Sequence, residues 1–162
     1  MCLTSLFFAL IFTGSILRVA SDEEGYFMKF ILVTNNKIVF DKIISYGKTK
    51  NLEKGIYLEN GTYKDVIEKV REMVHMGHEL LTHPLSGSIK PNETPYRSVL
   101  VSAEAGSLDF DSLKIIEDSI QTAEKFMAMA KPRNYNERHH NDFMTIDFHV
   151  IESGIESLNQ IW

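Results

Sequence analysis

The segment Thr82–Tyr96, THPLSGSIKPNETPY, holds the side chains best suited to chemistry in this 162-residue sequence. Its Ser86-Gly87-Ser88 turn offers two hydroxyls and exposed backbone N–H groups, which together can form an anion-binding nest. Lys90 adds a positive charge, and Arg97 adds a planar guanidinium suited to a carboxylate or a phosphate. The segment therefore predicts a site for a small anion.

His83 is the one candidate catalytic residue in this segment. It follows an apolar run directly, where a histidine can act as a general acid–base group. Three prolines in the segment fix φ and lower the entropy lost on ordering it. The same composition is also typical of an ordinary surface loop, with His83 bonded to a backbone carbonyl. The residues alone leave both interpretations open.

The elements that position this segment alternate between strand and helix. Apolar runs predict strands at Lys29–Thr34, Gly55–Leu58, ELLTH (Glu79–His83) and RSVLVSA (Arg97–Ala103). Helical spacing predicts helices at Lys37–Ile44, from the N-cap Thr62 to Gly77, and at Asp111–Ala130. This order predicts an α/β fold: a single three-layer, Rossmann-like domain whose mostly parallel sheet of four to five strands carries helices on both faces.

In such sheets, ligands bind beyond the carboxyl ends of the strands. Two polar segments follow predicted strands, namely TNN (Thr34–Asn36) and THPLSGS (Thr82–Ser88). We expect them to meet in one hollow at one edge of the sheet. The predicted ligand-binding residues are Thr34, Asn35, Asn36, Thr82, His83, Ser86, Gly87, Ser88, Lys90, Asn92 and Arg97.

Other polar clusters favour structural roles. His75, His78 and His83 resemble a metal set, but Gly77 interrupts the helix between the first two, so we predict no metal and no cofactor. Asp109 and Asp111 compete to cap the helix that follows them. His139 and His140 fall in Pro132–Asp142, PRNYNERHHND, which by composition is a solvated linker.

The C-terminal segment Phe143–Trp162 allows two interpretations. Met144, Ile146, Phe148 and Val150 alternate with other residues, which is typical of a strand. A short helix from Val150 onward is the alternative. The sequence does not decide between them.

Charge and cysteine content limit the class of protein. The net charge of −5 argues against nucleic acid as a partner. The only cysteine is Cys2, which suits a reducing cytoplasm and excludes an internal disulfide. Residues 1–27 contain the uncharged run Leu3–Leu17, which we interpret as upstream sequence translated by a start-site error, ahead of one domain at 28–162. A signal peptide is the second interpretation and a membrane anchor the third.

Three stretches resemble the GrdX family: MKFILVTNN, VREMVHMGHELLTHPLSGSIKPNETPYRSVLVS and SLKIIEDSIQTAEKF. The similarity covers most of Met28 to Ile155 and leaves out the first 27 residues. The resemblance implies a small protein encoded beside glycine, sarcosine and betaine reductase genes in anaerobic bacteria that ferment amino acids by Stickland reactions. It implies no assigned catalytic residue.

Two functions follow from these observations. The first is an accessory or regulatory protein that binds a small anionic metabolite, or a glycine reductase component, through Thr82–Tyr96. The alternative is a small hydrolase or transferase that uses His83 as its acid–base residue. No second catalytic partner for His83 is recognisable, which favours the first function. The domain itself calls for no membrane partner, and its apolar content is compatible with a homodimer.

Overall fold

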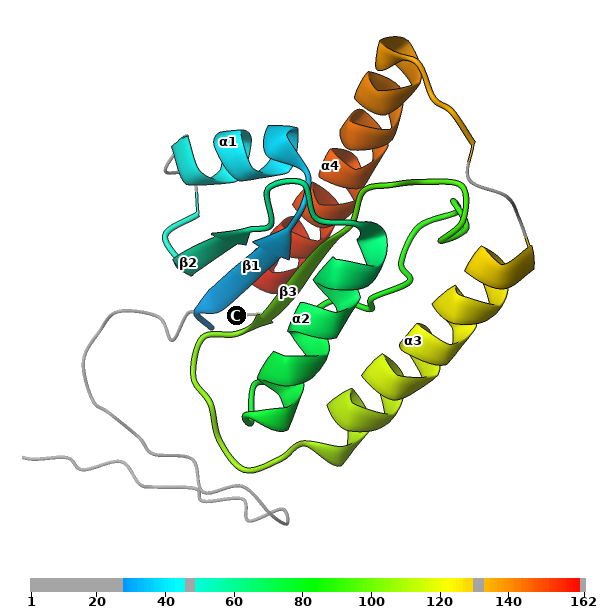
Figure 1. Ribbon diagram of the computed structural model, residues 1–162. Coiled ribbons are helices and arrows are strands. Elements are labelled where there is room, and N and C mark those ends of the chain that lie inside the picture. The colour runs from blue at the N-terminus through cyan, green and yellow to red at the C-terminus, as the bar shows by residue number, and fades with distance from the viewer. Residues whose placement is uncertain (1–27, 46–48, 130–132, 161–162) are drawn as a thin grey trace, which may run out of the picture.

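The computed structural model describes residues 28–45, 49–129 and 133–160. The predicted leader, residues 1–27, lies outside this range. The elements follow in the order β1 (Phe30–Thr34), α1 (Lys37–Ser45), β2 (Leu52–Tyr57), α2 (Tyr63–His75), β3 (Ser98–Ser102), α3 (Phe110–Met129) and α4 (Glu137–Gln160). Figure 1 shows the small sheet at the centre, with α3 lying beside α2.

The sheet has the strand order β2-β1-β3, with β1 parallel to β2 and antiparallel to β3. The predicted fold class, a mostly parallel sheet of four to five strands, is therefore wrong: the sheet is small and mixed. The central strand β1 is buried along its whole length, as its uninterrupted apolar sequence predicts. Strand β2 begins three residues before the predicted Gly55.

The predicted strand at Glu79–His83 accounts for much of this difference. It makes only one isolated bridge, between Leu80 and Val101, on the outer side of β3. Side chains accept two of its backbone N–H groups: Ser102 Oγ accepts the Glu79 N–H at 2.8 Å, and Ser112 Oγ accepts the Leu80 N–H at 2.9 Å. The segment runs along β3 without forming a regular ladder.

Helix α4 spans Glu137–Gln160, so the strand interpretation of the C-terminal segment is wrong and its alternative, a helix, is right in kind. The helix begins at Glu137 and not at Val150, and it therefore includes the last six residues of the predicted linker Pro132–Asp142. Asn136 begins α4 by accepting the His139 N–H on its side chain at 3.1 Å. The alternating pattern predicted that Ile146 is buried on one face of a strand, but this side chain is 44% exposed. The buried residues Phe148, Ile151 and Ile155 instead step by three and four, which is the spacing of a helix face.

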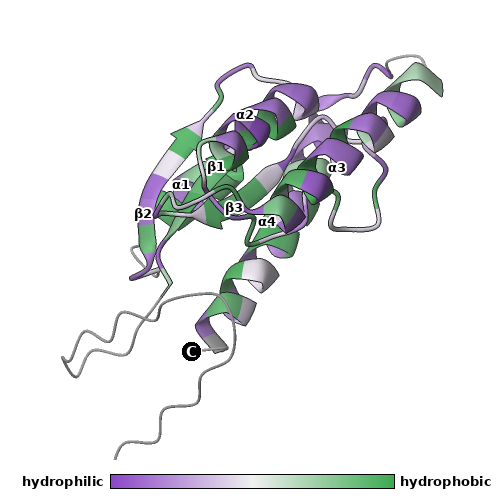
Figure 2. Cartoon of the chain, turned by 90° about the horizontal axis from the view of Figure 1, so that it is seen from below, coloured by the Kyte–Doolittle hydropathy of each residue, from purple (hydrophilic) through white to green (hydrophobic). Residues whose placement is uncertain are grey.

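Two apolar cores lie on opposite faces of the sheet. Ile31 and Val33 of β1 face α2 and α3, while Phe30 and Leu32 face α1 and α4. This alternation follows from the two-residue period of a strand. Figure 2 shows hydrophobic colour on the sheet and on the helix faces turned towards it.

The predicted helix ends of α2 are confirmed. The Thr62 side chain accepts from the Asp65 N–H, and the Asp65 side chain accepts from the Thr62 N–H, forming a capping box. Gly77 follows the helix with φ 98°, and a Cβ there would lie 2.1 Å from the Gly106 carbonyl oxygen. Of the two predicted N-cap residues of α3, Asp109 is the one that caps the helix, because its carboxylate accepts the Ser112 N–H at 2.6 Å.

Candidate functional site

Asn35 joins the segments that meet beyond the carboxyl ends of β1 and β2. Its Nδ2 donates to the Gly61 carbonyl and to the Pro95 carbonyl, each at 2.8 Å. Its Oδ1 accepts the Arg97 N–H at 2.8 Å. All three polar positions of this buried amide are therefore used, and they fix the turn before α2 against the end of the long connection to β3.

A hollow of about 680 Å³ opens between these two segments. One wall is the Asn60–Lys64 turn, and the other is Pro91–Tyr96 without Glu93. Tyr57 at the end of β2 and Met127 of α3 complete the lining. Asn60 has φ 60°, a conformation that asparagine tolerates in turns, and this directs the chain from β2 into α2.

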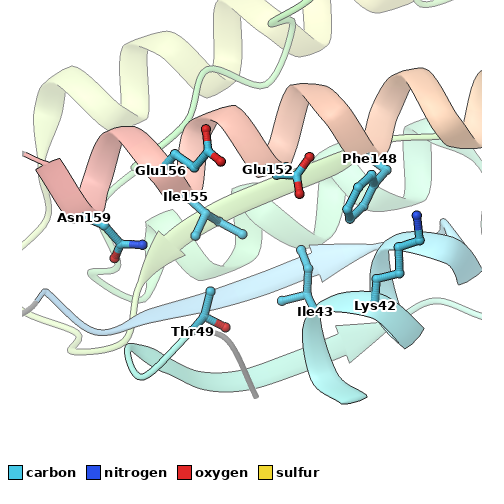
Figure 3. A pocket seen from close by; sticks show the side chains of 8 residues that line it. All are labelled: Lys42, Ile43, Thr49, Phe148, Glu152, Ile155, Glu156 and Asn159. Carbon is cyan, nitrogen blue, oxygen red and sulfur yellow. The ribbon is translucent and has the colours of Figure 1, made fainter. Parts of the chain in front are cut away.

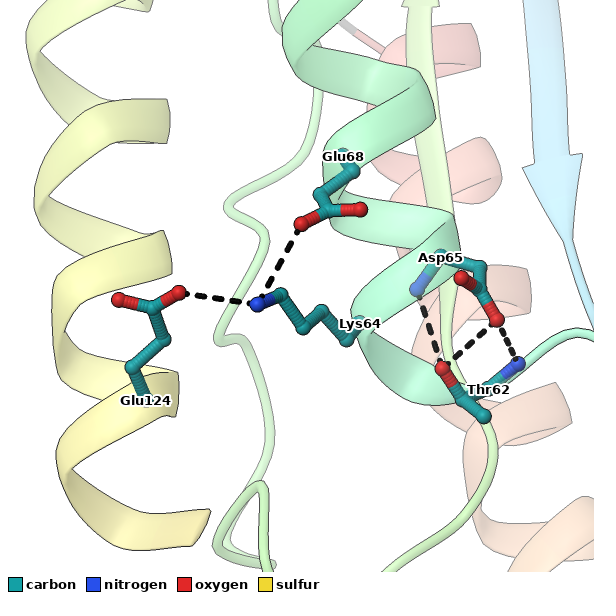
Figure 4. A network of polar contacts seen from close by, with 5 residues as sticks. All are labelled: Thr62, Lys64, Asp65, Glu68 and Glu124. Carbon is teal, nitrogen blue, oxygen red and sulfur yellow. Dashed lines mark hydrogen bonds and ion pairs between the residues drawn. The ribbon is translucent and has the colours of Figure 1, made fainter. Parts of the chain in front are cut away.

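Lys64 lines the hollow, but its charge is turned towards α3. Its Nζ lies 3.0 Å from Glu124 Oε1 and 3.5 Å from Glu68 Oε1 (Figure 4). The hydrogen bond to Glu124, followed by the charges of the two carboxylates, raises the pKa of Lys64. Lys64 therefore lies at the rim of the hollow with its ammonium group held in ion pairs with Glu68 and Glu124.

Tyr96 connects the hollow to α4. Its hydroxyl lies 3.0 Å from His140 Nδ1, and the two rings meet edge to face with centroids 5.8 Å apart. Burial, and then the nearby Tyr57, raise the pKa of Tyr96, so the phenol stays protonated at neutral pH. The sequence indicated His140 as one of a solvated pair, whereas this histidine is half-buried and bonded.

Arg97 holds the loop that precedes it. Its Nη1 donates to the Ser86 carbonyl at 2.6 Å, and its Nη2 donates to Ser86 Oγ at 2.7 Å and to the His83 carbonyl at 3.2 Å. The side chain is 5% exposed. The Nη1 and Nη2 groups of Arg97 therefore donate to other groups of the protein. The Nε atom is buried without a partner among the described residues.

A chain of buried hydrogen bonds lies beside Arg97 and ends on Asp147. The Asn36 N–H donates to Thr34 Oγ1 at 2.9 Å, and Thr34 Oγ1 lies 2.7 Å from Ser98 Oγ. Ser98 donates to Asp147 Oδ2 at 2.6 Å, which makes Thr34 the donor to Ser98. Asn36 Nδ2 donates to the same carboxylate oxygen at 2.9 Å. This chain fixes α4 against the ends of β1 and β3.

Asp147 was not among the predicted residues, because it lies in the segment interpreted as strand or short helix. Burial raises its pKa above the usual value for an aspartate, while the hydrogen bonds from Ser98 and Asn36 and the charge of Arg97 oppose this rise. The carboxyl group is thus a buried acid at the centre of a polar network.

The predicted site residues fall into separate groups. Asn35 and Asn92 line the hollow of about 680 Å³. Ser86, Gly87, Ser88 and Arg97 line a much smaller cavity of about 20 Å³ against α4, together with Asp147. Lys90 is exposed, with its Nζ 5.9 Å from the centre of the Phe126 ring. Thr82 and His83 line an open hollow of about 610 Å³ against α4, together with Ser86. Thr34 and Asn36 belong to the buried network.

The His83 side chain stabilises the turn in which it lies. The ring is exposed, and its Nδ1 accepts the Leu85 N–H at 3.0 Å. The other two histidines of the supposed metal set bond elsewhere: His75 to Glu117 at 3.2 Å and His78 to the Ser102 carbonyl at 2.8 Å. Within residues 28–45, 49–129 and 133–160, no three potential ligands are grouped to hold a metal ion.

Another groove, of about 520 Å³, lies between α1 and α4. Figure 3 shows its apolar floor, Ile43, Phe148 and Ile155, with the carboxylates of Glu152 and Glu156 on α4. Lys42 places its Nζ 4.2 Å from the centre of the Phe148 ring. This groove lacks the converging backbone segments and the turn before a helix that surround Asn35.

In the described parts of the chain, no helix combines the length and the apolar character needed to cross a membrane.

The structure is that of a small α/β protein with a preformed hollow at the carboxyl ends of its two parallel strands. The family model described as GrdX-like protein matches residues 31–156. The chain therefore belongs to the GrdX-like family, as the sequence resemblance indicated. Comparison with curated proteins and with solved structures found no match.

Proposed function

We propose that this protein is an accessory component of the glycine reductase system that binds a small metabolite in the hollow between Asn60–Lys64 and Pro91–Tyr96. Membership of the GrdX-like family supports the metabolic setting. Glycine is the simplest candidate ligand, since it is a small carboxylate of that system. The segment Thr82–Tyr96 takes part through five of its last six residues, Pro91–Tyr96 without Glu93, which form one wall.

The observation that carries this proposal is the bonding of Asn35. One side chain holds both walls, through the Gly61 and Pro95 carbonyls, at the edge of the sheet where α/β proteins bind ligands. A cavity whose walls are fixed before binding loses little entropy when a ligand enters. The exposed His83, with its Nδ1 engaged by Leu85, gives the alternative hydrolase or transferase function less support.

A thermal-shift screen tests the proposal. The compounds are glycine, sarcosine, betaine, acetyl phosphate and phosphate. A ligand at one hundred times its dissociation constant stabilises the folded state by about 2.7 kcal/mol, which raises the melting temperature by several degrees for a domain of this size.

Two variants on α3 locate the binding. Met127→Trp fills the hollow from its α3 side, whereas Ile115→Trp changes an exposed residue elsewhere on the same helix. We expect Met127→Trp to abolish the ligand-induced shift and Ile115→Trp to retain it. The absence of any shift for all five compounds would contradict the proposal.

A further inference from the structure

A hollow of about 440 Å³ lies where the connection to β3 approaches the start of α4, and we name it the Arg133 hollow. One part of its lining is Asn92, Thr94 and Pro95, which also line the hollow described above. The other part is residues 133–135 together with His140 of α4. The two hollows therefore share lining residues, and the Arg133 hollow has no role in the proposed function.

Two tyrosine hydroxyls fix the walls of the Arg133 hollow. The Tyr135 hydroxyl donates to the Glu93 carbonyl at 2.6 Å and so ties the segment before α4 to the connection. The Tyr96 hydroxyl lies 3.0 Å from His140 Nδ1. The Tyr135 ring also packs edge to face on Phe143 of α4, with ring centroids 4.9 Å apart. A cavity held in this way before binding loses little entropy when a ligand enters.

The charged residues around the Arg133 hollow favour an anion. Among the described residues that line it, Arg133 is the only lysine, arginine or acidic residue. Its guanidinium forms no ion pair with a carboxylate of the described residues, whereas Lys64 of the neighbouring hollow pairs with two. The acidic residues close to the lining in sequence, Glu93, Glu137 and Asp142, are not part of it. An arginine in this setting can bind a carboxylate or a phosphate through its planar fork of N–H groups.

His140 can add a donor to the same hollow. Because the Tyr96 phenol stays protonated, it can donate to His140 Nδ1. The proton of the neutral imidazole then lies on Nε2, and this N–H is the group left to donate to a ligand. His140 is half-buried and lies in the first turn of α4, where the partial positive charge of the helix also favours an anion.

We propose that the Arg133 hollow binds a small oxyanion, a carboxylate or a phosphate group, with Arg133 and His140 as its donors. This inference goes beyond the proposed function, because it assigns a ligand to another hollow and does not depend on glycine binding beside Asn35. It also concerns a different place from the anion site predicted in Ser86–Lys90, since none of those residues lines the Arg133 hollow.

The experiment titrates the full chain with phosphate, acetate and acetamide at constant ionic strength and follows nitrogen–proton correlation spectra. Acetamide has the size of acetate without its charge. We expect phosphate or acetate to shift the backbone amides of Asn134, Tyr135 and His140 with one dissociation constant, and acetamide to leave them in place. A smaller dissociation constant for phosphate assigns the site to a phosphate group, and a smaller one for acetate assigns it to a carboxylate.

Two matched pairs of variants locate the binding. Arg133→Gln removes the guanidinium, and we expect at least tenfold weaker binding of the preferred anion. Arg138→Gln makes the same change of charge at an exposed position of α4 outside the lining, and we expect unchanged binding. His140→Phe and its exposed neighbour His139→Phe form the other pair, with a severalfold loss expected for His140→Phe alone. Circular dichroism and the melting temperature without ligand check that all four variants fold.

The outcomes separate this inference from the proposed function. If neither phosphate nor acetate shifts these amides, or if Arg133→Gln and Arg138→Gln weaken binding equally, the oxyanion site is wrong and glycine binding beside Asn35 still stands. Met127→Trp fills the hollow held by Asn35, so we expect it to leave oxyanion binding unchanged. If Met127→Trp instead abolishes the binding of phosphate and acetate, the anion binds in the hollow held by Asn35 and this inference is overturned.

Discussion

The hydroxyl of Ser98 donates to Asp147 Oδ2 at 2.6 Å, and this single bond joins the start of β3 to the middle of α4. Asn36, at the start of α1, donates to the same oxygen. Three elements far apart in the sequence thus meet on one buried carboxylate. The adjacent residues Asn35 and Arg97 hold the hollow, so the network and the candidate site share their support.

The first prediction concerns the pH dependence of stability through Asp147. Burial raises its folded pKa above that of the unfolded chain, so the folded state keeps this proton over a pH interval in which the unfolded chain has released it. The group therefore favours folding most below the unfolded pKa, and this contribution is lost as the pH rises through the folded pKa. We expect Asp147→Asn to flatten this part of the pH profile, without lowering the melting temperature at pH 7.

The matched variant is Asp147→Ala, which leaves the Ser98 hydroxyl and the Asn36 amide without their shared acceptor. We expect a loss of about 2–4 kcal/mol, because two buried donors become unsatisfied. Denaturant unfolding between pH 3 and pH 8 measures both variants. An Asp147→Asn protein as unstable at pH 7 as Asp147→Ala would show that the ionised carboxylate stabilises the fold, contrary to this account.

The second prediction concerns Arg97. Its guanidinium makes three hydrogen bonds to Ser86 and His83, and a lysine ammonium cannot reproduce this planar arrangement. We expect Arg97→Lys to cost about 2 kcal/mol and to raise amide exchange and proteolysis within Thr82–Ser88. Lys90→Arg, at an exposed position of the same connection, is the control. Unchanged exchange in Arg97→Lys would mean that the loop is held by other contacts.

The third prediction tests α4 as a helix. Ile155 is 6% exposed and packs in the core with Phe148, whereas Ile146 is 44% exposed. We expect Ile155→Ala to cost about 2–4 kcal/mol, and Ile146→Ala to change stability by less than about 1 kcal/mol. Chemical denaturation measures both. A loss at Ile146→Ala as large as that at Ile155→Ala would contradict the placement of Ile146 on the exposed face of the helix.

The fourth prediction concerns Asn35 as the link between the two walls of the hollow. Asn35→Ala removes three hydrogen bonds and leaves the Gly61 and Pro95 carbonyls without this donor. We expect a loss of about 2–4 kcal/mol, together with weaker metabolite binding. Measuring binding at a temperature where the variant is fully folded, as judged by circular dichroism, separates the two effects.

The sequence predicted the elements whose signals are local. The apolar run of β1, the capping box at Thr62 and the glycine after α2 each depend on neighbouring residues, and each is confirmed. Strand pairing could not be predicted in the same way. Whether β3 runs parallel or antiparallel to β1, and whether Glu79–His83 forms a ladder, depends on partners such as Ser112, which lies thirty-two residues from Leu80.

The candidate site shows the same division. Asn35 does bond to Pro95, in the later part of the connection. Thr82–Ser88, the stretch expected to share a hollow with Thr34–Asn36, lines separate cavities against α4. The roles of Tyr57, His140 and Asp147 could not be predicted, because each depends on a contact with a distant residue. An aspartate among apolar residues, as in the TIDFHV segment of α4, was the available signal for a buried network.

The most direct test of the central claim is a nitrogen–proton correlation spectrum of the folded protein titrated with glycine. We predict that the side-chain amides of Asn35 and Asn92 and the backbone amides of Asn60–Lys64 shift together, with one dissociation constant. Shifts confined to Ser86–Lys90, or to the groove between α1 and α4, would contradict the claim that the hollow held by Asn35 is the binding site.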